Sequence, residues 1–271
     1  MLYTKNILEI VKLAIASSYV KNTRPVNILL VGEPEIGKSS ILLKFRENNG
    51  LRIFTDLTKN KLDNFLVDVA RENKQVRYLI VPDFLKVISR NRSARANVIT
   101  YLNALIEEGL KEVSIMTSRG QETYKLKKTL RVGIATAITR SALTNEIKVW
   151  KKLGFMSRFL PISFSYTAEQ IKQIRREIFS NSDYDNDKNK IKLNLKCSEV
   201  KCSSKFYDYF DSYIVNFAKA YSLYGFRLTA QIKSLLMGSA LLRNSKRVTM
   251  TDVKKLLNLM KWINLDFNVV E

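Results

Sequence analysis

The chain has 271 residues, of which 46 are Lys or Arg, 25 are Asp or Glu and none is His, so its formal net charge is +21. The hydrophobic share of 46% and the charged share of 26% are typical of globular proteins and exclude a chain that is disordered throughout. The absence of histidine excludes a histidine-based metal site, general base or catalytic triad, and the excess of positive charge favours a polyanionic partner.

Apolar runs alternate with helical patterns in the first part of the chain. After an expected N-terminal helix within residues 1–25, the apolar runs lie at 26–31, 78–81 and 131–137. The segments with helical periodicity lie at 39–47, 61–73 and 93–108. This alternation predicts an α/β fold with a parallel sheet covered by helices on both faces. The polar segment at about 113–130 predicts a β-hairpin inserted before the last of these strands.

The character of the chain changes near residue 167. Amphipathic patterns predict helices at 168–179, 206–224, 229–242 and 251–263. The segment 191–204 is compatible with two short strands or with irregular chain. We therefore expect three parts, which are an N-terminal helix (1–25), an α/β core (26–167) and a small C-terminal helical domain (168–271).

The two cysteines and the apolar segments limit the remaining possibilities. Cys197 and Cys202 are too few for a four-thiolate zinc site, so we expect no zinc. We expect reduced thiols, although one disulfide is compatible with the sequence. The N-terminal apolar positions are interrupted by charges, and no run of about 20 apolar residues occurs. These features predict a cytoplasmic protein with no membrane partner.

Residues 32–39 (GEPEIGKS) match the pattern G-x-x-x-x-G-K-[ST] in full, between an expected strand and an expected helix. The glycines allow the backbone to wrap round phosphates, while Lys38 reaches the β- and γ-phosphates and the Ser39 hydroxyl binds Mg²⁺. We therefore expect a P-loop that binds ATP and Mg²⁺, the alternative being a tight turn that carries Lys-Ser by chance. The residues expected to bind the nucleotide are Gly32, Glu33, Pro34, Glu35, Ile36, Gly37, Lys38, Ser39 and Ser40.

A P-loop also needs a carboxylate at the end of another strand to hold the Mg²⁺ shell. Asp83 follows the apolar run 78–81 and is expected to supply it, or else to cap a helix that begins near Phe84. Many P-loop enzymes place a glutamate directly after this aspartate to polarise the attacking water, but here the next residue is Phe84. The sequence therefore leaves open catalysis by another group or slow hydrolysis.

Further segments occur in the order of a known family. They are 101–109 (YLNALIEEG), 131–139 (RVGIATAIT), 154–161 (GFMSRFLP), 226–229 (FRLT) and 247–253 (RVTMTDV). Together with the P-loop, their order resembles that of AAA+ ATPases, and most closely the clade of MCM replicative helicases, MoxR-type ATPases and activators of the alternative sigma factor. The resemblance implies an AAA+ core with a C-terminal helical lid, assembled from identical subunits into a ring or partial ring with ATP between neighbours.

The resemblance also implies roles for three residues. Arg158 would be the arginine finger that reaches the neighbour's γ-phosphate, or else a surface arginine or a contact to a nucleic-acid phosphate. Arg227 would be sensor 2, contacting the ATP of its own subunit, or else part of a salt bridge at a helix start. Thr139 would be sensor 1, although the family's usual asparagine falls near Ile138. Thr136 is an alternative, and either threonine is equally compatible with an ordinary strand position.

Two basic stretches are candidates for sequence-tolerant DNA contact. In the resembling helicases the hairpin points into the central channel of the ring. The hairpin contacts expected here are Arg119, Tyr124, Lys125, Lys127 and Lys128, with Tyr124 stacking on a base. The second stretch carries Lys86, Arg90, Arg92 and Arg95 with no acid between them. Each stretch is also compatible with an ordinary solvated face.

Three functions follow from these features. The leading one is an ATP-hydrolysing, oligomeric AAA+ protein that acts on single- or double-stranded DNA, as a replication or mobile-element initiator, a helicase loader or a minimal motor. The second is an ATP-gated DNA-binding clamp with slow hydrolysis. The third is a protein remodeller whose charge serves only solubility. Stimulation of hydrolysis by DNA separates the first from the second, and DNA binding at moderate salt separates both from the third.

Overall fold

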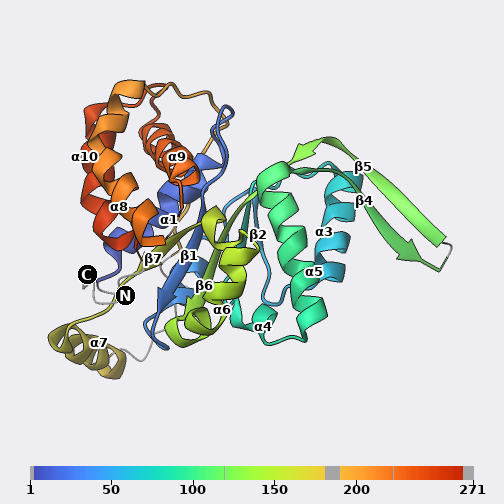
Figure 1. The fold of residues 1–271 in the computed structure, drawn as a ribbon, viewed down its shortest axis with the longest axis horizontal. Helices are drawn as coiled ribbons and strands as arrows, with labels where there is room; N and C mark the ends of the chain where they lie inside the picture. Colours follow the sequence, from blue (N-terminus) through green and yellow to red (C-terminus); the bar gives the residue numbers. More distant parts are fainter. Residues whose placement is uncertain (1–2, 119, 181–189, 222, 265–271) are drawn as a thin grey trace.

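The structure is a computed structural model that describes residues 3–118, 120–180, 190–221 and 223–264. A five-stranded sheet with the order β2-β3-β6-β1-β7 runs through the middle of the molecule (Figure 1), and each neighbouring pair is parallel. Its strands are β1 (Asn27–Gly32), β2 (Leu51–Ile53), β3 (Tyr78–Val81), β6 (Gly133–Thr139) and β7 (Phe159–Ser163). The predicted parallel α/β sheet is therefore confirmed.

Helices cover both faces of this sheet, which explains why its central strands consist mainly of apolar residues. Because successive side chains of a strand point to opposite faces, Ile28 and Leu30 of β1 join one hydrophobic cluster, and Leu29 and Val31 join the other. The helices are α1 (Lys5–Ser17), α2 (Lys38–Leu43), α3 (Lys59–Glu72), α4 (Leu85–Ile88), α5 (Arg92–Asn103), α6 (Arg140–Lys152), α7 (Ala168–Ser180), α8 (Asp211–Tyr221), α9 (Phe226–Leu242) and α10 (Met250–Leu259). Shorter helical segments are η1 (Ala104–Glu108, a π-helix), η2 (Met156–Arg158), η4 (Ser204–Tyr209) and η5 (Met260–Trp262).

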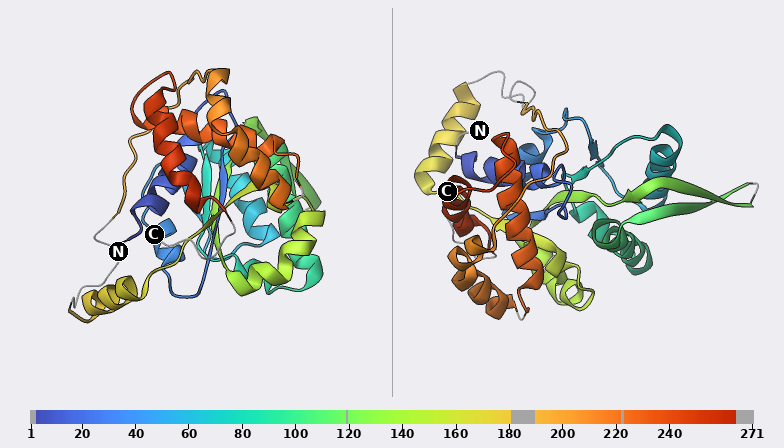
Figure 2. Two further views of the ribbon diagram at one scale, coloured as in Figure 1. Left: turned by 60° about the vertical axis from the view of Figure 1, so that its left-hand side comes forward. Right: turned by 90° about the horizontal axis from the view of Figure 1, so that it is seen from above.

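A two-stranded antiparallel hairpin extends from the body of the molecule (Figures 1 and 2). It consists of β4 (Leu110–Thr117) and β5 (Gly120–Leu130). The side chains of β5 alternate between half-buried and exposed positions. Tyr124 and Leu126 pack against the cluster that includes α3, whereas Lys125 and Lys127 are exposed. The hairpin therefore has an apolar face toward α3 and a basic face toward solvent.

After β7 the chain runs back to the end of the sheet at which the strands begin, and there it forms the C-terminal helices. Helix α7 stands away from the body (Figure 2), and none of its residues is buried. Residues 190–203 then contain no strand, and they are held by isolated bridges, including one between Val20 and Ser198, by hydrogen bonds to Asn48, and by apolar packing. Val20 precedes β1, so this segment carries the C-terminal helices to the edge where the strands begin.

Helix α1 and the C-terminal helices share one hydrophobic core with one face of the sheet. The backbones of α1 and α9 lie close together at Gly238, where an added Cβ atom would lie 2.6 Å from the carbonyl oxygen of Leu13. Only glycine permits this approach of the two backbones. The C-terminal helices are thus packed directly on the rest of the chain, and the division near residue 167 stays a prediction.

Two further expectations concern membranes and thiols. Within the part of the chain that the structure describes, no helix has both the length and the apolar composition needed to cross a membrane. Cys197 and Cys202 are free thiols, as predicted. The described residues also contain no group of three or more Cys, Asp or Glu side chains that could hold a metal ion.

Asp252 stabilises the last helix and provides a test of the fold. It is fully buried, forms a capping box with Thr249, and accepts hydrogen bonds from Ser239 Oγ (2.8 Å) and Arg243 Nη2 (2.6 Å). Burial opposes ionisation, but the hydrogen bonds from Arg243, Thr249 and Ser239 hold the pKa of Asp252 below its ordinary value. We expect Asp252→Asn to lower the free energy of unfolding by about 2 kcal/mol.

Urea unfolding at several pH values measures this effect. Since the folded-state pKa is lowered, the stabilisation is fully present above the ordinary aspartate pKa of about 3.9 and is lost as the pH falls through the folded-state value. The control is Asp208→Asn, because Asp208 is exposed. An equal loss of stability in both variants would contradict the assigned role of Asp252.

Candidate functional site

The P-loop connects the end of β1 to the start of α2. Gly37 has a φ of 85° and precedes the first helical residue, Lys38. At Gly32, an added Cβ would lie 2.2 Å from Ile36 Cδ1. The left-handed backbone conformation of Gly37 favours glycine at that position, whereas a side chain at Gly32 would displace the end of the Ile36 side chain.

The side chain of Lys38 folds over this loop. Its Nζ donates hydrogen bonds to the carbonyl oxygens of Gly32 (2.9 Å) and Glu33 (2.5 Å), and the residue is buried. Burial lowers the pKa of Lys38, while the nearby carboxylates of Glu33 and Asp83 oppose the decrease. An ammonium group held by this loop suits an anion such as a phosphate.

Ser39 and Asp83 lie at the same place, as a magnesium site requires. Ser39 Oγ donates a hydrogen bond to the carbonyl oxygen of Pro82 (2.9 Å), which directly follows β3, and Asp83 is the next residue in the chain. A hydroxyl and a carboxylate supply the oxygen ligands that Mg²⁺ prefers, so the residues fit this ion. Asp83 Oδ1 also accepts a hydrogen bond from Leu85 N (2.9 Å), the first residue of α4, but the N-cap position of that helix is Phe84.

The two threonines considered for sensor 1 differ in position. Thr139 pairs with Gly32 in the sheet register and therefore lies beside the P-loop. Its Oγ1 accepts a hydrogen bond from Ala142 N (3.3 Å) at the start of α6. Thr136 is fully buried, and its Oγ1 donates to the carbonyl oxygen of Val81 (2.8 Å). Of the two, Thr139 is the one that lies at the edge of the nucleotide loop.

Phe84 occupies the position where many P-loop enzymes have a glutamate, and its side chain is fully buried. Its ring stacks on Phe155 at 5.7 Å between centroids and contacts the edge of Trp150 at 5.6 Å. The aromatic core therefore accounts for this residue, and the position supplies no group that activates water.

A cavity of about 420 Å³ lies between the P-loop and α7. Besides residues 32–36 of the loop, its lining includes Phe164, Tyr166 and Ile171. Tyr166 also donates a hydrogen bond from its hydroxyl to the carbonyl oxygen of Ile36 (3.1 Å). Sequence reasoning did not assign these residues, although they follow directly on β7 in the chain.

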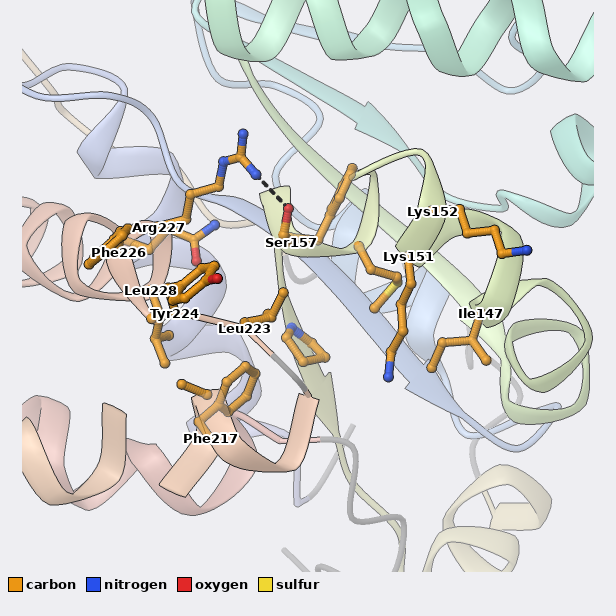
Figure 3. A pocket seen from close by; sticks show the side chains of 16 residues that line it. Ile147, Lys151, Lys152, Ser157, Phe217, Leu223, Tyr224, Phe226, Arg227 and Leu228 are labelled. Atoms are coloured by element: carbon orange, nitrogen blue, oxygen red, sulfur yellow. Dashed lines mark hydrogen bonds between the residues drawn. The ribbon is translucent and has the colours of Figure 1, made fainter. Parts of the chain in front are cut away.

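Arg158 and Arg227 lie together at the end of the sheet where the strands begin, opposite the end that carries the P-loop. Asn27 Nδ2 at the start of β1 donates a hydrogen bond to the carbonyl oxygen of Arg158 (3.0 Å). Arg227 Nη1 donates to Ser157 Oγ (2.7 Å; Figure 3). Strand β1 has six residues, so roughly 16–20 Å separate this edge from the P-loop. The structure therefore does not bring Arg227 to the nucleotide loop of its own subunit, where the sensor-2 interpretation places it.

Two hollows adjoin these arginines. A pocket of about 430 Å³ contains one carboxylate, that of Glu107, and six cationic side chains, from Lys21, Arg24, Arg131, Arg158, Arg227 and Lys233. A mainly apolar groove of about 640 Å³ lies between α6 and the start of α9 (Figure 3). At its rim the exposed rings of Tyr224 and Phe226 stack at 5.8 Å. This edge therefore combines positive charge with exposed apolar surface.

The hairpin residues considered for DNA contact fall on different faces. Lys125, Lys127 and Lys128 are exposed. Tyr124 lies on the other face of β5, where its hydroxyl accepts a hydrogen bond from Arg71 (2.7 Å) and its ring lies 4.9 Å from the Arg71 guanidinium. The structure thus engages Tyr124 with α3 and does not place it among the exposed lysines. Arg119 lies outside the described residues.

Ion pairs hold part of the second basic stretch. Arg90 pairs with Asp56 (2.6 Å) and Arg95 pairs with Glu146 (2.6 Å), both acids being distant in the sequence. Arg92 is exposed. The stretch contains no acid in sequence, but in the fold two of its arginines have carboxylate partners.

The sheet order and the loop after its first strand define an α/β fold consistent with an AAA+ core. A curated relative, the Holliday junction branch migration complex subunit RuvB of Mycoplasmopsis synoviae (strain 53), is 27% identical over 178 residues, which are 64% of this chain and 51% of that protein. The chain therefore spans about half the length of this relative. No family model matches the chain. The similarity supports the AAA+ family at most and does not select the MCM and MoxR clade.

Proposed function

We propose that this protein is an ATP-hydrolysing, oligomeric AAA+ protein that acts on DNA. The observation that carries the proposal is the division of the expected site between two edges of one sheet. Lys38, Ser39 and Asp83 lie at one edge, and Arg158 and Arg227 lie at the other. Because roughly 16–20 Å separate the edges, the arginines act on a nucleotide only if a neighbouring copy holds it. Such a contact is head-to-tail and generates a ring or partial ring.

In the proposed site, Lys38 and the backbone of the P-loop bind the phosphates of ATP. Mg²⁺ neutralises phosphate charge when it is bound, and Ser39 and Asp83 would hold it. Thr139 lies beside Gly32 and is the candidate to contact the γ-phosphate.

Arg158 and Arg227 would stabilise the charge that develops during phosphoryl transfer in the neighbour's site. This assignment changes the expected role of Arg227 from a contact within its own subunit to one between subunits. It follows from the hydrogen bond between Arg227 and Ser157, the residue directly before Arg158.

Action on DNA is supported by charge and by the comparison. The net charge of +21 favours a polyanion, and β5 carries exposed lysines at positions 125, 127 and 128. The name of the relative describes a protein of a DNA branch migration complex. Replication or mobile-element initiator, helicase loader and minimal motor are the specific roles that fit this proposal.

The exposed lysines of the hairpin give a test of DNA contact. Replacing both Lys125 and Lys127 with alanine is expected to weaken DNA binding and to reduce the slope of log K against log salt by about 2, because two phosphate contacts are lost. The control replaces Lys246 and Lys254 with alanine, which are also exposed and change the net charge equally. Anisotropy titrations at several salt concentrations measure both. Equal slopes in the two double variants would contradict a hairpin contact.

A second candidate, an ATP-gated DNA clamp with slow hydrolysis, is favoured by the burial of Phe84. Steady-state ATP hydrolysis with and without single-stranded and duplex DNA separates the two functions. Strong stimulation by DNA supports a protein that uses ATP to work on DNA. Slow hydrolysis that DNA does not change, in a protein that still binds DNA, supports the clamp. Absence of DNA binding at moderate salt would overturn both and indicate a protein substrate.

A further inference from the structure

The carboxylate of Glu107 lies between Arg158 and Arg227. Its Oε2 is 3.8 Å from the Nε atoms of both arginines, and its Oε1 forms an ion pair with Arg24. We infer that Glu107 is the positioning residue that holds Arg158 and Arg227 side by side to face the nucleotide of a neighbouring subunit. This inference rests on the proposed shared site, and it assigns a role to a residue that the sequence showed only as part of an apolar helix ending in EEG.

Two arginines held side by side repel each other, and a carboxylate between them offsets this repulsion. Burial and the charge of Arg227 both lower the pKa of Arg158, while Glu107 and Glu108 raise it. The Nε of Arg158 is buried and has no hydrogen-bond partner among the described residues, so the carboxylate is the group that compensates it. Glu107 therefore offsets the repulsion that would otherwise drive the guanidinium groups apart.

A single carboxylate compensates the cluster only in part. Arg24, Arg158 and Arg227 contact Glu107, and the pocket around them contains further cationic groups. The cluster keeps an excess of positive charge and thus attracts a phosphate that approaches from outside. Glu107 can hold the arginines in place without neutralising them.

The backbone fixes the position of Glu107 from both ends of the hairpin. Glu107 is the penultimate residue of the π-helix η1, which is followed by Gly109, whose φ is 79°, and by strand β4. After β5, Arg131 Nη2 donates a hydrogen bond to the carbonyl oxygen of Glu108 (3.0 Å). Short π-helices occur frequently at functional sites. The base of the hairpin therefore sets where the carboxylate meets the two arginines.

The test replaces Glu107 with glutamine, which removes the charge and keeps the size. We expect kcat for ATP hydrolysis to fall about 10- to 100-fold, as for a catalytic group displaced by about 1 Å, while ATP affinity stays unchanged. The matched control is Glu72→Gln, the same change at an exposed glutamate of α3 that pairs with Lys74 and lies outside the arginine cluster. A loss of ATP affinity, an equal decrease in both variants, or unchanged or faster hydrolysis in Glu107→Gln would overturn the inference.

Mixed oligomers then show whether Glu107 acts through the arginines. An Asp83→Ala subunit has an intact arginine edge, so mixing it with Glu107→Gln is expected to restore hydrolysis. Mixing Glu107→Gln with Arg158→Ala is expected to restore none, because both changes affect the same edge. The reverse pattern would overturn the inference. If Arg158→Ala and Asp83→Ala also do not restore hydrolysis when they are mixed, the proposed shared site is wrong. If that pair restores hydrolysis and only Glu107→Gln departs from the pattern, the inference about Glu107 alone is wrong.

Discussion

Replacing Lys38 with alanine is expected to abolish productive ATP binding, with a rise in Kd of at least about 100-fold. The reason is that Lys38 places its ammonium group inside the P-loop, 2.9 Å from the carbonyl oxygen of Gly32, where the phosphates of ATP would lie. Titration of a fluorescent ATP analogue measures the affinity, and circular dichroism confirms that the variant is folded.

Lys254→Ala is the control for this experiment. It removes the same charge from an exposed position on α10 and is expected to leave ATP affinity unchanged. If Lys38→Ala binds ATP as tightly as the unaltered protein, the assignment of residues 32–39 to a phosphate-binding loop is wrong.

Replacing Arg158 with alanine is expected to reduce ATP hydrolysis by roughly 10³-fold or more while ATP binding stays nearly intact. Binding is preserved because Arg158 lies at the opposite edge of the sheet from the P-loop of its own subunit. In that subunit its guanidinium is held by the carbonyl oxygen of Gly154 (2.5 Å) and by Glu107. It is therefore available to a neighbour's phosphate only if it leaves or shares these partners.

Arg158→Lys and Arg247→Ala test the specificity of this effect. Lysine keeps the charge but lacks the planar, bidentate guanidinium, so Arg158→Lys is expected to recover only part of the activity. Arg247 is exposed and is expected to tolerate alanine. A loss of ATP affinity in Arg158→Ala that equals its loss of turnover would contradict an action between subunits.

The sheet and the phosphate loop are the features that the sequence predicts best. The apolar runs 26–31, 78–81 and 131–137 overlap β1, β3 and β6, and burial of these strands on both faces explains why they consist mainly of apolar residues. The position of Ser39 beside Asp83 also follows from the pattern, because the carboxyl ends of parallel strands meet at one edge of a sheet.

The position of the C-terminal helices could not be predicted in this way. Their internal pattern indicates helices, but only the path of residues 190–203 determines which edge of the sheet they reach. That path places Arg227 beside Arg158 and away from the P-loop. The contact depends on tertiary packing, for which a local sequence pattern carries no signal.

Ion pairs between distant parts of the sequence could not be predicted either. The absence of acids between Arg90 and Arg95 suggests a free basic surface, but Asp56 and Glu146 reach these arginines from other parts of the chain. Tyr124 is a similar case, since the alternation along β5 separates it from Lys125 and Lys127 and turns it toward α3. That alternation was visible in the sequence and could have assigned Tyr124 to the opposite face.

The central claim is that one ATP site is built from two subunits, and mixing two inactive variants tests it most directly. Arg158→Ala keeps an intact P-loop edge, and Asp83→Ala keeps an intact arginine edge. In a mixed oligomer, some interfaces pair the intact edges of both variants, so we predict that steady-state ATP hydrolysis recovers to a fraction of the unaltered protein's rate. No recovery in an oligomer confirmed to contain both variants would contradict the shared site.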